Sequence, residues 1–468
     1  MGIFKGLNKE DKDAIGLLRF GTFLENFDLM LYIHMAVVLN DLFFPPSDHH
    51  LTPYLSAALF SSTFILRPVG ALVFGWIGDN YGRKTTVMIT MFMMASTCFI
   101  VANLSTYAEI GITATWMIVI CRMVQGVSSL GEVVGAELYL METLKPPHQY
   151  PAVAFVTLSA VSGSLVALGS SALCLGFTNL NWRVAFWFGC AVGFAGSIAR
   201  IKLRESGEFV REKERHALKS SLKESSKKDL DNPKRAFWEN KNNIFKTGFI
   251  FFMMQLSFPI SFYFSFVYCP GLLKEFYHYS PLGIMSHSFI ATLAVFVSYF
   301  VIAKLSYKMD PFKILKFKAA LFPVVTLLCP FALSYLAPSG FDPSGGNPVT
   351  GGALMILMIQ SIAVVVSLDT IPATPIFFSY FPTLQRFTYV SVTYALSRAL
   401  TYPITAFGMI YLSNTFGHFG WWVLFIPTFA VFAYGLRYFL DLEKDFGDHS
   451  FGQEDDHPLE KTKKWAAL

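Results

Sequence analysis

Two carboxylates stand in the first long apolar run of the chain, a setting where charged side chains are rare. Glu25 and Asp28 are three residues apart in a run near 14–42, so a helix would place them on one face. At 1.5 Å per residue, Glu25 would lie about 16 Å into this run, near the middle of a membrane. A carboxylate there is costly unless it is paired, hydrated or protonated. At least one of them is therefore a candidate for carrying a proton or contacting a substrate, and the alternative is a structural carboxyl group bonded to a neighbouring helix.

A second polar constellation lies in the apolar run near 111–141. On a helical wheel, an arc of about 80° contains four polar residues, which are Arg122, Gln125, Ser129 and Glu132. A stripe that narrow on an apolar helix must face a bundle interior or a water-filled cavity. A fixed cation at Arg122 can pair with a substrate carboxylate or lower the pKa of a nearby carboxyl group. The alternative is a buried ion pair with Glu25, Asp28 or Glu132.

Later in the chain, Asp369 and Arg398 are the chief charges inside apolar runs, and they either pair with each other or face a cavity. The six cysteines lie in or beside apolar runs without CxxC or metal-ligand spacing, so we read them as packed free thiols. The sequence therefore predicts no metal site and no catalytic cluster, but a set of intramembrane charges that can bind protons and small ions.

These charges belong to helices that must cross a membrane. The chain has 468 residues, 53% hydrophobic and 15% charged, whereas soluble proteins carry about 25% charged residues. Twelve apolar runs are long enough to span the hydrocarbon layer, and they lie near 14–42, 54–77, 85–104, 111–141, 152–177, 183–203, 246–270, 283–304, 314–337, 351–378, 389–412 and 420–440. This pattern excludes a soluble protein, a disordered chain and a disulfide scaffold, and it predicts an all-α membrane protein with twelve transmembrane helices.

The runs form two groups of six, which divides the chain into four parts. We expect an N-terminal six-helix half at 1–203, a polar linker at 204–245, a C-terminal six-helix half at 246–440 and a polar tail at 441–468. Lys and Arg collect in alternate loops, the linker and both ends, which places both termini and the linker in the cytoplasm. That count includes the second-half loop lysines Lys304, Lys308, Lys313, Lys316 and Lys318. A 6+6 layout is typical of transporters built from two repeated halves.

The loop between the second and third runs carries a specific motif. It contains Gly75, Asp79, Gly82, Arg83 and Lys84. The glycines allow a tight turn, and Asp79 can accept hydrogen bonds from the N-terminus of a neighbouring helix. Arg83 and Lys84 hold the loop in the cytoplasm and can form ion pairs across the two halves. The spacing resembles the G-x-x-x-D-x-x-G-R-[KR] signature of the major facilitator superfamily.

Further strings narrow the resemblance to the metabolite:proton symporter family of that superfamily, whose members carry proline and betaine, 2-oxoglutarate, citrate or shikimate. They begin at Gly21, Arg67, Arg122, Trp182 and Arg204, with Phe381–Thr383 and Arg386 in the second half. The resemblance implies the major facilitator fold, alternating access and, for the string from Arg122, a link to proton coupling. Together with the charges described above, the candidate site combines the signature loop with Glu25, Asp28, Arg122, Gln125, Glu132, Asp369 and Arg398.

We therefore expect a secondary active transporter: a proton-coupled symporter of a small organic acid or zwitterion in the bacterial inner membrane. The proton gradient would supply the driving force without a cofactor, and the partners would be a carboxylate or zwitterionic substrate, protons and the lipid bilayer. No Walker motif, HExxH or GxSxG occurs, so ATP-driven transport by this chain and an enzyme are disfavoured. No nucleic-acid partner is indicated, and we expect a monomer. The alternatives are an uncoupled or exchange carrier and, less favoured, a non-transporting receptor.

Overall fold

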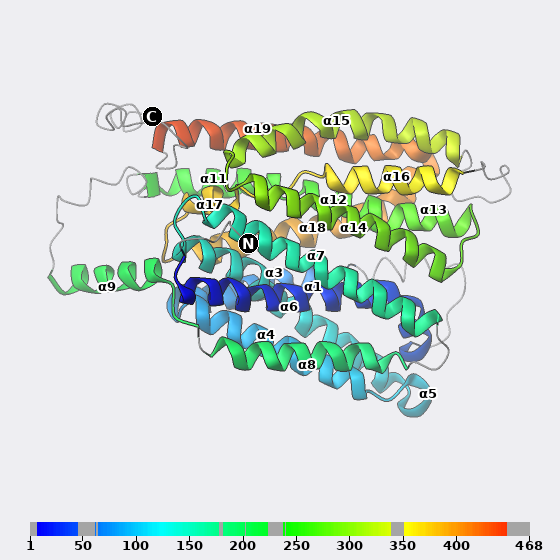
Figure 1. Ribbon diagram of the computed structural model, residues 1–468, viewed down its shortest axis with the longest axis horizontal. Helices are drawn as coiled ribbons and strands as arrows, with labels where there is room; N and C mark the ends of the chain where they lie inside the picture. The colour runs from blue at the N-terminus through cyan, green and yellow to red at the C-terminus, as the bar shows by residue number, and fades with distance from the viewer. Residues whose placement is uncertain are drawn as a thin grey trace.

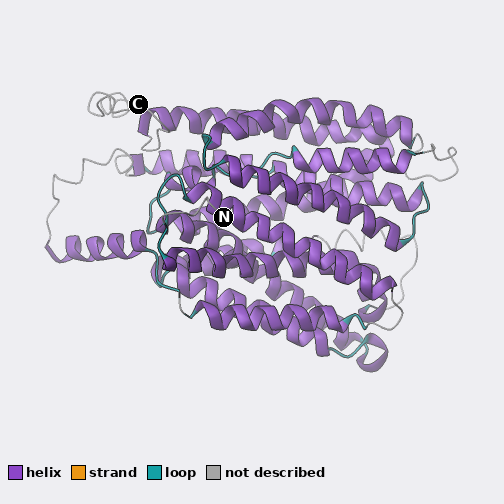
Figure 2. Ribbon diagram, viewed as in Figure 1, coloured by secondary structure: helices purple, strands orange, loops and turns teal. Residues whose placement is uncertain are grey.

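The computed structural model describes residues 7–44, 61, 64–176, 181–201, 203–222, 237–238, 240–337 and 351–446. Within these ranges every regular element is a helix (Figure 2). The N-terminal group comprises α1 (Lys9–Phe43), α3 (Arg67–Asn80), α4 (Arg83–Asn103), α5 (Tyr107–Ile110), α6 (Ile112–Thr143), α7 (Gln149–Gly176) and α8 (Arg183–Arg200). A helix of the polar linker follows, α9 (Gly207–Leu222).

The C-terminal group begins with a helix in four pieces, α11 (Lys241–Met254), α12 (Ser257–Tyr263), the π-helical η2 (Phe264–Tyr268) and α13 (Cys269–Glu275). It continues with α14 (Pro281–Leu305), α15 (Pro311–Leu336), α16 (Gly352–Val365), α17 (Thr374–Ser379), α18 (Arg386–Phe416), the 3₁₀ turn η4 (Gly417–Phe419) and α19 (Gly420–Phe446). By length and hydropathy alone, seven helical stretches of the described chain can cross a membrane. The all-helical membrane fold is therefore confirmed.

The two groups lie side by side as roughly parallel bundles (Figure 1). Between them, α3 packs against α18, α7 against α14, and α6 against both α17 and α18. Helix α9, the short α17 and the C-terminal end of α19 lie at one end of the bundle, on the left in Figure 1. We call this end the latch end, because charged side chains of both groups meet there.

Close helix packing in the N-terminal group depends on two glycines of α6. A Cβ on Gly131 would come within 2.4 Å of Thr90, and one on Gly135 within 2.8 Å of Val87, both in α4. The small-residue pair at this spacing thus lets α4 and α6 approach each other closely. This contact fixes the position of the polar residues of α6 relative to α4.

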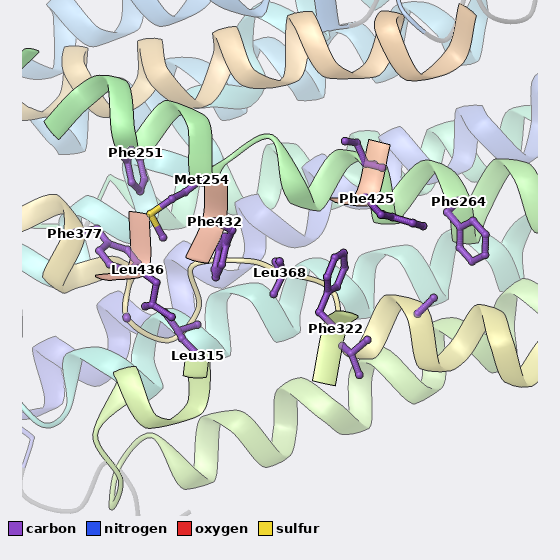
Figure 3. Packing of buried hydrophobic residues seen from close by; sticks show 14 of the residues in the cluster. Phe251, Met254, Phe264, Leu315, Phe322, Leu368, Phe377, Phe425, Phe432 and Leu436 are labelled. Atoms are coloured by element: carbon purple, nitrogen blue, oxygen red, sulfur yellow. The ribbon is translucent and has the colours of Figure 1, made fainter. Parts of the chain in front are cut away.

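Aromatic rings fill much of the core of the C-terminal group (Figure 3). Phe322 and Phe425 meet edge to face at 5.7 Å between ring centroids, and Phe251 lies 6.1 Å from Phe377. Such pairs add roughly 0.5–1.5 kcal/mol each beyond the area they bury. They hold α11, α15, α17 and α19 around the charged residues of this group.

The apolar run near 351–378 is not one helix. Helix α16 ends at Val365 and α17 begins at Thr374, and the buried segment between them has no regular structure. Pro372 and Pro375 stand in and just after the break, where a proline cannot donate the backbone hydrogen bonds of a continuing helix. Non-helical backbone inside a membrane protein occurs where it is buried in protein or lines a cavity. Asp369 lies in this break.

Candidate functional site

The two carboxylates of α1 bind different arginines. Glu25 accepts a hydrogen bond from Nη2 of Arg67 at 3.1 Å, and Asp28 accepts one from Nη1 of Arg122 at 2.9 Å. All four side chains are buried. Of the alternatives that the sequence left open, Arg122 therefore pairs with Asp28, and the partner of Glu25 comes from α3.

The Asp28–Arg122 pair is the more elaborate of the two. Gln125 donates through Nε2 to the second oxygen of Asp28 at 2.9 Å and accepts from Arg122 Nη1 at 2.6 Å. The Arg122 guanidinium lies over the Tyr32 ring at 3.9 Å from its centroid. Even so, Nε and Nη2 of Arg122 are buried without a hydrogen-bond acceptor among the described residues. An arginine with unused buried donors keeps a positive charge that is only partly neutralised, and it attracts further anionic groups.

Glu132, which shares the polar stripe of α6, belongs to a different cluster. Arg200 of α8 donates through Nη1 to both carboxylate oxygens at 2.7 and 2.9 Å, and Thr90 donates to one of them. Arg200 also donates to the carbonyl oxygens of Leu17, Leu18 and Val87. With so many contacts satisfied, this pair fits a structural clamp between α1, α4, α6 and α8.

In the C-terminal group, the first of the two alternatives for Asp369 and Arg398, pairing with each other, does not occur. Asp369 instead accepts from Nζ of Lys318 at 2.7 Å and from the hydroxyl of Tyr299 at 2.6 Å. The assignment of Lys318 to a loop was wrong, because this residue lies within α15 and is 7% exposed. A lysine two turns into a helix that begins at Pro311 cannot be told from a loop lysine by composition alone.

Arg398 of α18 has only uncharged partners among the described residues. Its Nη1 donates to Oε1 of Gln255 at 3.2 Å and to Oγ of Ser397 at 3.0 Å, and its guanidinium stacks on Tyr394 at 3.6 Å from the ring centroid. The charged groups that act on it include Glu137 of α6, which comes from the N-terminal group. Glu137 was not among the site residues predicted from the sequence. A third carboxylate in the apolar helix α6 should have been included, because ionisable residues in membrane helices mark candidate functional sites.

At the latch end, Asp79 accepts hydrogen bonds from the N-terminus of α18, as expected from its place at the end of α3. The donors are the backbone N–H of Phe387 at 3.1 Å and of Thr388 at 2.9 Å, with the Thr388 hydroxyl at 2.6 Å. A carboxylate at a helix N-terminus is favoured by the partial positive charge there. Asp79 thus joins the N-terminal group to the C-terminal group.

Arg83 is fully buried and binds Glu142 of α6 through two hydrogen bonds of 2.9 Å. Its ion pair therefore stays within the N-terminal group, although Nη2 also donates across to the carbonyl oxygen of Thr383. The ion pairs that do cross come from Arg386, which binds Glu142 at 3.2 Å and Glu208 of α9 at 3.0 Å. We call Asp79, Arg83, Glu142, Glu208 and Arg386 the latch.

Lys84 makes no ion pair among the described residues and donates to the carbonyl oxygen of Ile201. The pKa of Glu208 lies below its ordinary value: burial raises it, but the neighbouring Arg386 cation and a hydrogen bond from Thr383 lower it more. Glu208 therefore stays ionised, and its pairing with Arg386 is lost only as the pH falls through that lowered pKa. The linker is thus helical in part, and the first turn of α9 belongs to the latch through Glu208.

The glycines of the signature loop make these contacts possible. A Cβ on Gly75 would lie 2.8 Å from Cα of Thr388, and one on Gly78 would lie 2.4 Å from the Phe387 ring. Gly82 has φ +114°, which side-chain-bearing residues rarely adopt, and faces the Glu205 carboxylate that accepts from the backbone N–H of Arg83. Without these glycines α18 cannot approach α3 closely enough to reach Asp79.

Asp79→Asn should weaken the latch without unfolding the protein. The change removes the negative charge and replaces one carboxylate oxygen, an acceptor, by an NH₂ group, which cannot accept from the N–H groups of the α18 N-terminus. The closed latch should lose about 1–2 kcal/mol of stability, which lowers the ratio of closed to open protein five- to thirty-fold. Solute uptake should fall while the amount of protein in the membrane stays near normal. Asn80→Ala, which loses only a bond to the Trp76 carbonyl, is the matched control. Wild-type uptake by Asp79→Asn would mean that the loop serves orientation alone.

The described residues contain no group of three or more His, Cys, Asp or Glu side chains that can hold a metal ion. Several functional groups were not predicted from the sequence, namely Arg67, Glu137, Glu142, Arg200, Glu208 and the buried role of Lys318. Most are charges in or beside apolar helices whose partners lie more than 40 residues away in the chain. The fold determines which charges pair. A charged residue in an apolar helix therefore indicates that it has a partner, but its sequence position does not identify that partner.

Comparison with known proteins agrees with the all-helical membrane fold. The Major Facilitator Superfamily pattern matches residues 20–400. The proline/betaine transporter of Escherichia coli (strain K12) is 26% identical over 397 residues, covering 82% of this chain and 75% of that protein. The glycine betaine/proline/ectoine/pipecolic acid transporter OusA of Dickeya dadantii is 25% identical over 61% of this chain and 56% of its own length.

Among solved structures, a proton:xylose symporter, XylE, superposes with a TM-score of 0.70 at 14% identity, covering 92% of this chain and 95% of that one. The human organic anion transporter MFSD10 gives a TM-score of 0.58 at 13% identity, with 92% of this chain covered and 100% of that one. These likenesses establish the fold, and the pattern match establishes the family. This multi-pass membrane protein, a transporter and not an enzyme, belongs to the Major Facilitator Superfamily.

Proposed function

We propose that this protein is a proton-coupled symporter of a small organic acid or zwitterion that works by alternating access. The observation that carries the proposal is the Asp28–Arg122–Gln125 cluster, a buried ionisable pair in which the arginine has unused donors. When Asp28 takes up a proton, Arg122 loses its counter-ion and the cluster gains one positive charge, which favours binding of a substrate acid group between the two groups of helices. Proton binding and substrate binding are thereby coupled through the charge of this cluster.

The latch supports alternating access. Its residues bind the two groups together at one end of the bundle through Asp79 and through the Arg386–Glu142 ion pair. With the latch closed, the opposite end is the one that can open, and rocking of one group against the other would break these contacts and open the latch end. In this proposal the latch end is cytoplasmic, and its closure holds the outward-facing and occluded states.

We further propose the complete topology that the sequence predicts. Twelve spans would form two six-helix halves at 1–203 and 246–440 in the bacterial inner membrane, with the termini, the linker at 204–245 and the tail at 441–468 in the cytoplasm. Both the loop lysines and the common position of α9 and the end of α19 support this orientation. We propose a monomer as the transporting unit.

In a cysteine-free background, Ala108→Cys and Glu214→Cys should react with impermeant thiol reagents from opposite sides of the membrane. Both side chains are exposed, one in α5 and the other on α9 at the latch end. Labelling of intact cells should reach Cys at position 108 alone, and lysed cells should show both. If both positions react in intact cells, the proposed orientation is wrong.

The substrate class follows in part from the relatives. Two relatives that match 82% of this chain are named proline/betaine transporters, which favours a zwitterion over a di- or tricarboxylate for this chain. Thermal-shift screening of the purified protein against proline, glycine betaine, 2-oxoglutarate and citrate tests this, because a ligand that binds only the folded state raises the melting temperature. Counterflow in proteoliposomes then separates a carrier from a receptor that binds without transport.

An uncoupled or exchange carrier is the second candidate. It is favoured by the ion pairs themselves, since Glu25, Asp28 and Glu132 each have an arginine partner and can serve structure alone. Such a carrier would exchange solute without responding to a pH gradient. Measuring solute accumulation in proteoliposomes with and without a pH gradient decides between the two.

A further inference from the structure

Of the three carboxylates of α6, one has no partner. Glu132 binds Arg200, and Glu142 binds Arg83 and Arg386, whereas Glu137 has neither an ion pair nor a hydrogen bond within the described part of the chain. Its side chain is partly exposed even though α6 packs against α17 and α18. Arg398, Asp369 and Tyr299, all in the C-terminal group, are close enough to interact with it electrostatically. Glu137 therefore faces the interface between the two groups.

Arg398 is its counterpart on the other side. It is 6% exposed, and among the buried arginines of the described chain it alone has no carboxylate partner. Only Nη1 donates a hydrogen bond, to Gln255 and Ser397, so Nε and Nη2 are left without an acceptor in the described chain. Stacking on Tyr394 holds the plane of the guanidinium in place. Two donors in a fixed plane match the geometry of a carboxylate.

The other charges at this interface are already neutralised. Asp369 binds Lys318 and Tyr299, so the Asp369–Lys318 pair adds no net charge. Glu137 and Arg398 remain as one negative and one positive pole, carried by opposite groups, each without a counter-ion of its own among the described residues. A buried or half-buried charge in this position is stabilised when a ligand supplies the opposite charge.

We propose that Glu137 and Arg398 are the two poles of a binding site for a zwitterion, with the ligand carboxylate on Arg398 and its cationic nitrogen facing Glu137. The inference rests on the proposed transport function and chooses between the two substrate classes left open there. A dicarboxylate would bring its second negative charge toward Glu137, so the same residue selects against it. Because the poles belong to different groups, the ligand bridges them and favours their approach.

The test compares ligands that differ in one pole only. Glycine betaine and 3,3-dimethylbutyrate have nearly the same shape, with carbon in place of the charged nitrogen in the second; proline and cyclopentanecarboxylate are a second such pair. The purified wild-type protein should bind the zwitterion of at least one pair about tenfold or more tightly than its carbon analogue, as measured by calorimetry.

Two substitutions should then give different signatures. Glu137→Gln should weaken zwitterion binding and bring the ratio between zwitterion and analogue close to one, because only the nitrogen pole is lost. Arg398→Gln should weaken both ligands alike and leave the ratio nearly unchanged. Glu137→Asp and Arg398→Lys should restore part of the binding, which a purely structural role does not predict. Glu132→Gln, the same change in the same helix beside Arg200, should lower the melting temperature and keep the ratio.

The outcomes that overturn the inference are distinct from failure of the proposed function. If Glu137→Gln binds the zwitterion with the wild-type ratio, Glu137 does not face the nitrogen. If the protein accumulates 2-oxoglutarate or citrate along a pH gradient and binds neither zwitterion, the site is wrong and the symporter remains. If no solute is carried at all, the proposed function fails as well.

Discussion

Asp28→Asn is expected to abolish uphill accumulation of solute while leaving exchange of solute across the membrane intact. Asn has the shape of a protonated Asp and keeps an acceptor for Arg122, so substrate can still bind, but no proton can be released to the cytoplasm. In proteoliposomes with a pH gradient, the ratio of internal to external solute should fall to unity, and counterflow should persist. The effect is large because one pH unit is worth about 1.4 kcal/mol per proton, a tenfold concentration ratio.

Two further variants make this result specific. Glu25→Gln tests the other carboxylate of the same helix face, whose partner Arg67 comes from α3; we expect it to keep pH-driven accumulation. Glu132→Gln disrupts the satisfied pair with Arg200 and should lower stability without uncoupling. If Asp28→Asn still accumulates solute to the wild-type ratio, Asp28 does not carry the coupling proton, and Glu25, Glu137 and Asp369 become the candidates.

Glu142→Gln is expected to open the latch. The Glu142 side chain is fully buried and neutralises both Arg83 and Arg386. Its loss leaves Arg83 with only the longer contact to Asp79 at 3.5 Å, and Arg386 with only the half-exposed Glu208. Removing one partner of a buried pair costs about 3–5 kcal/mol. The cost applies only while the latch is closed, since both arginines are hydrated once it opens. The ratio of open to closed protein should therefore rise by about two to four orders of magnitude.

Spin labels at Tyr81 and Gln385, which are exposed on opposite groups at the latch end, report this change as a longer distance. Glu208→Gln should lengthen the distance less, because Glu142 still pairs with Arg386. If Glu142→Gln does not fold, Arg386→Gln gives the same reading, since Arg83 keeps Glu142 neutralised in that variant. An unchanged distance distribution in the folded variants would show that the latch does not set the conformational balance.

The sequence predicted those parts of the site that a single helix determines. Glu25 and Asp28 share a face of α1, the stripe from Arg122 to Glu132 is buried, and Asp79 reaches a helix N-terminus, as the spacing and the signature loop indicated. These are local consequences of helical periodicity and turn chemistry. The family resemblance supplied the fold, which is confirmed, and the domain limits remain a prediction.

What the sequence did not predict is the pairing between helices. Arg67, Arg200 and Lys318 each neutralise a carboxylate that lies 42 to 68 residues away along the chain, and no periodicity records such a choice. The break between α16 and α17 was missed although the sequence signals it, since Asp369, Pro372 and Pro375 interrupt the apolar run. Lys318 was misplaced because loop charge and buried charge look alike near the start of a span. In each case tertiary packing decides, and only a charge in an apolar helix indicates that a partner must exist.

Coupling of solute movement to a pH gradient is tested most directly in proteoliposomes. With glycine betaine or proline at equal concentration on both sides, an acidic exterior should drive net uptake of the transported solute, and an acidic interior should drive net release. Collapsing the gradient with a protonophore should stop both movements. If solute moves only down its own concentration gradient, at the same rate with or without the pH difference, the protein is an uncoupled carrier and proton-coupled symport is contradicted.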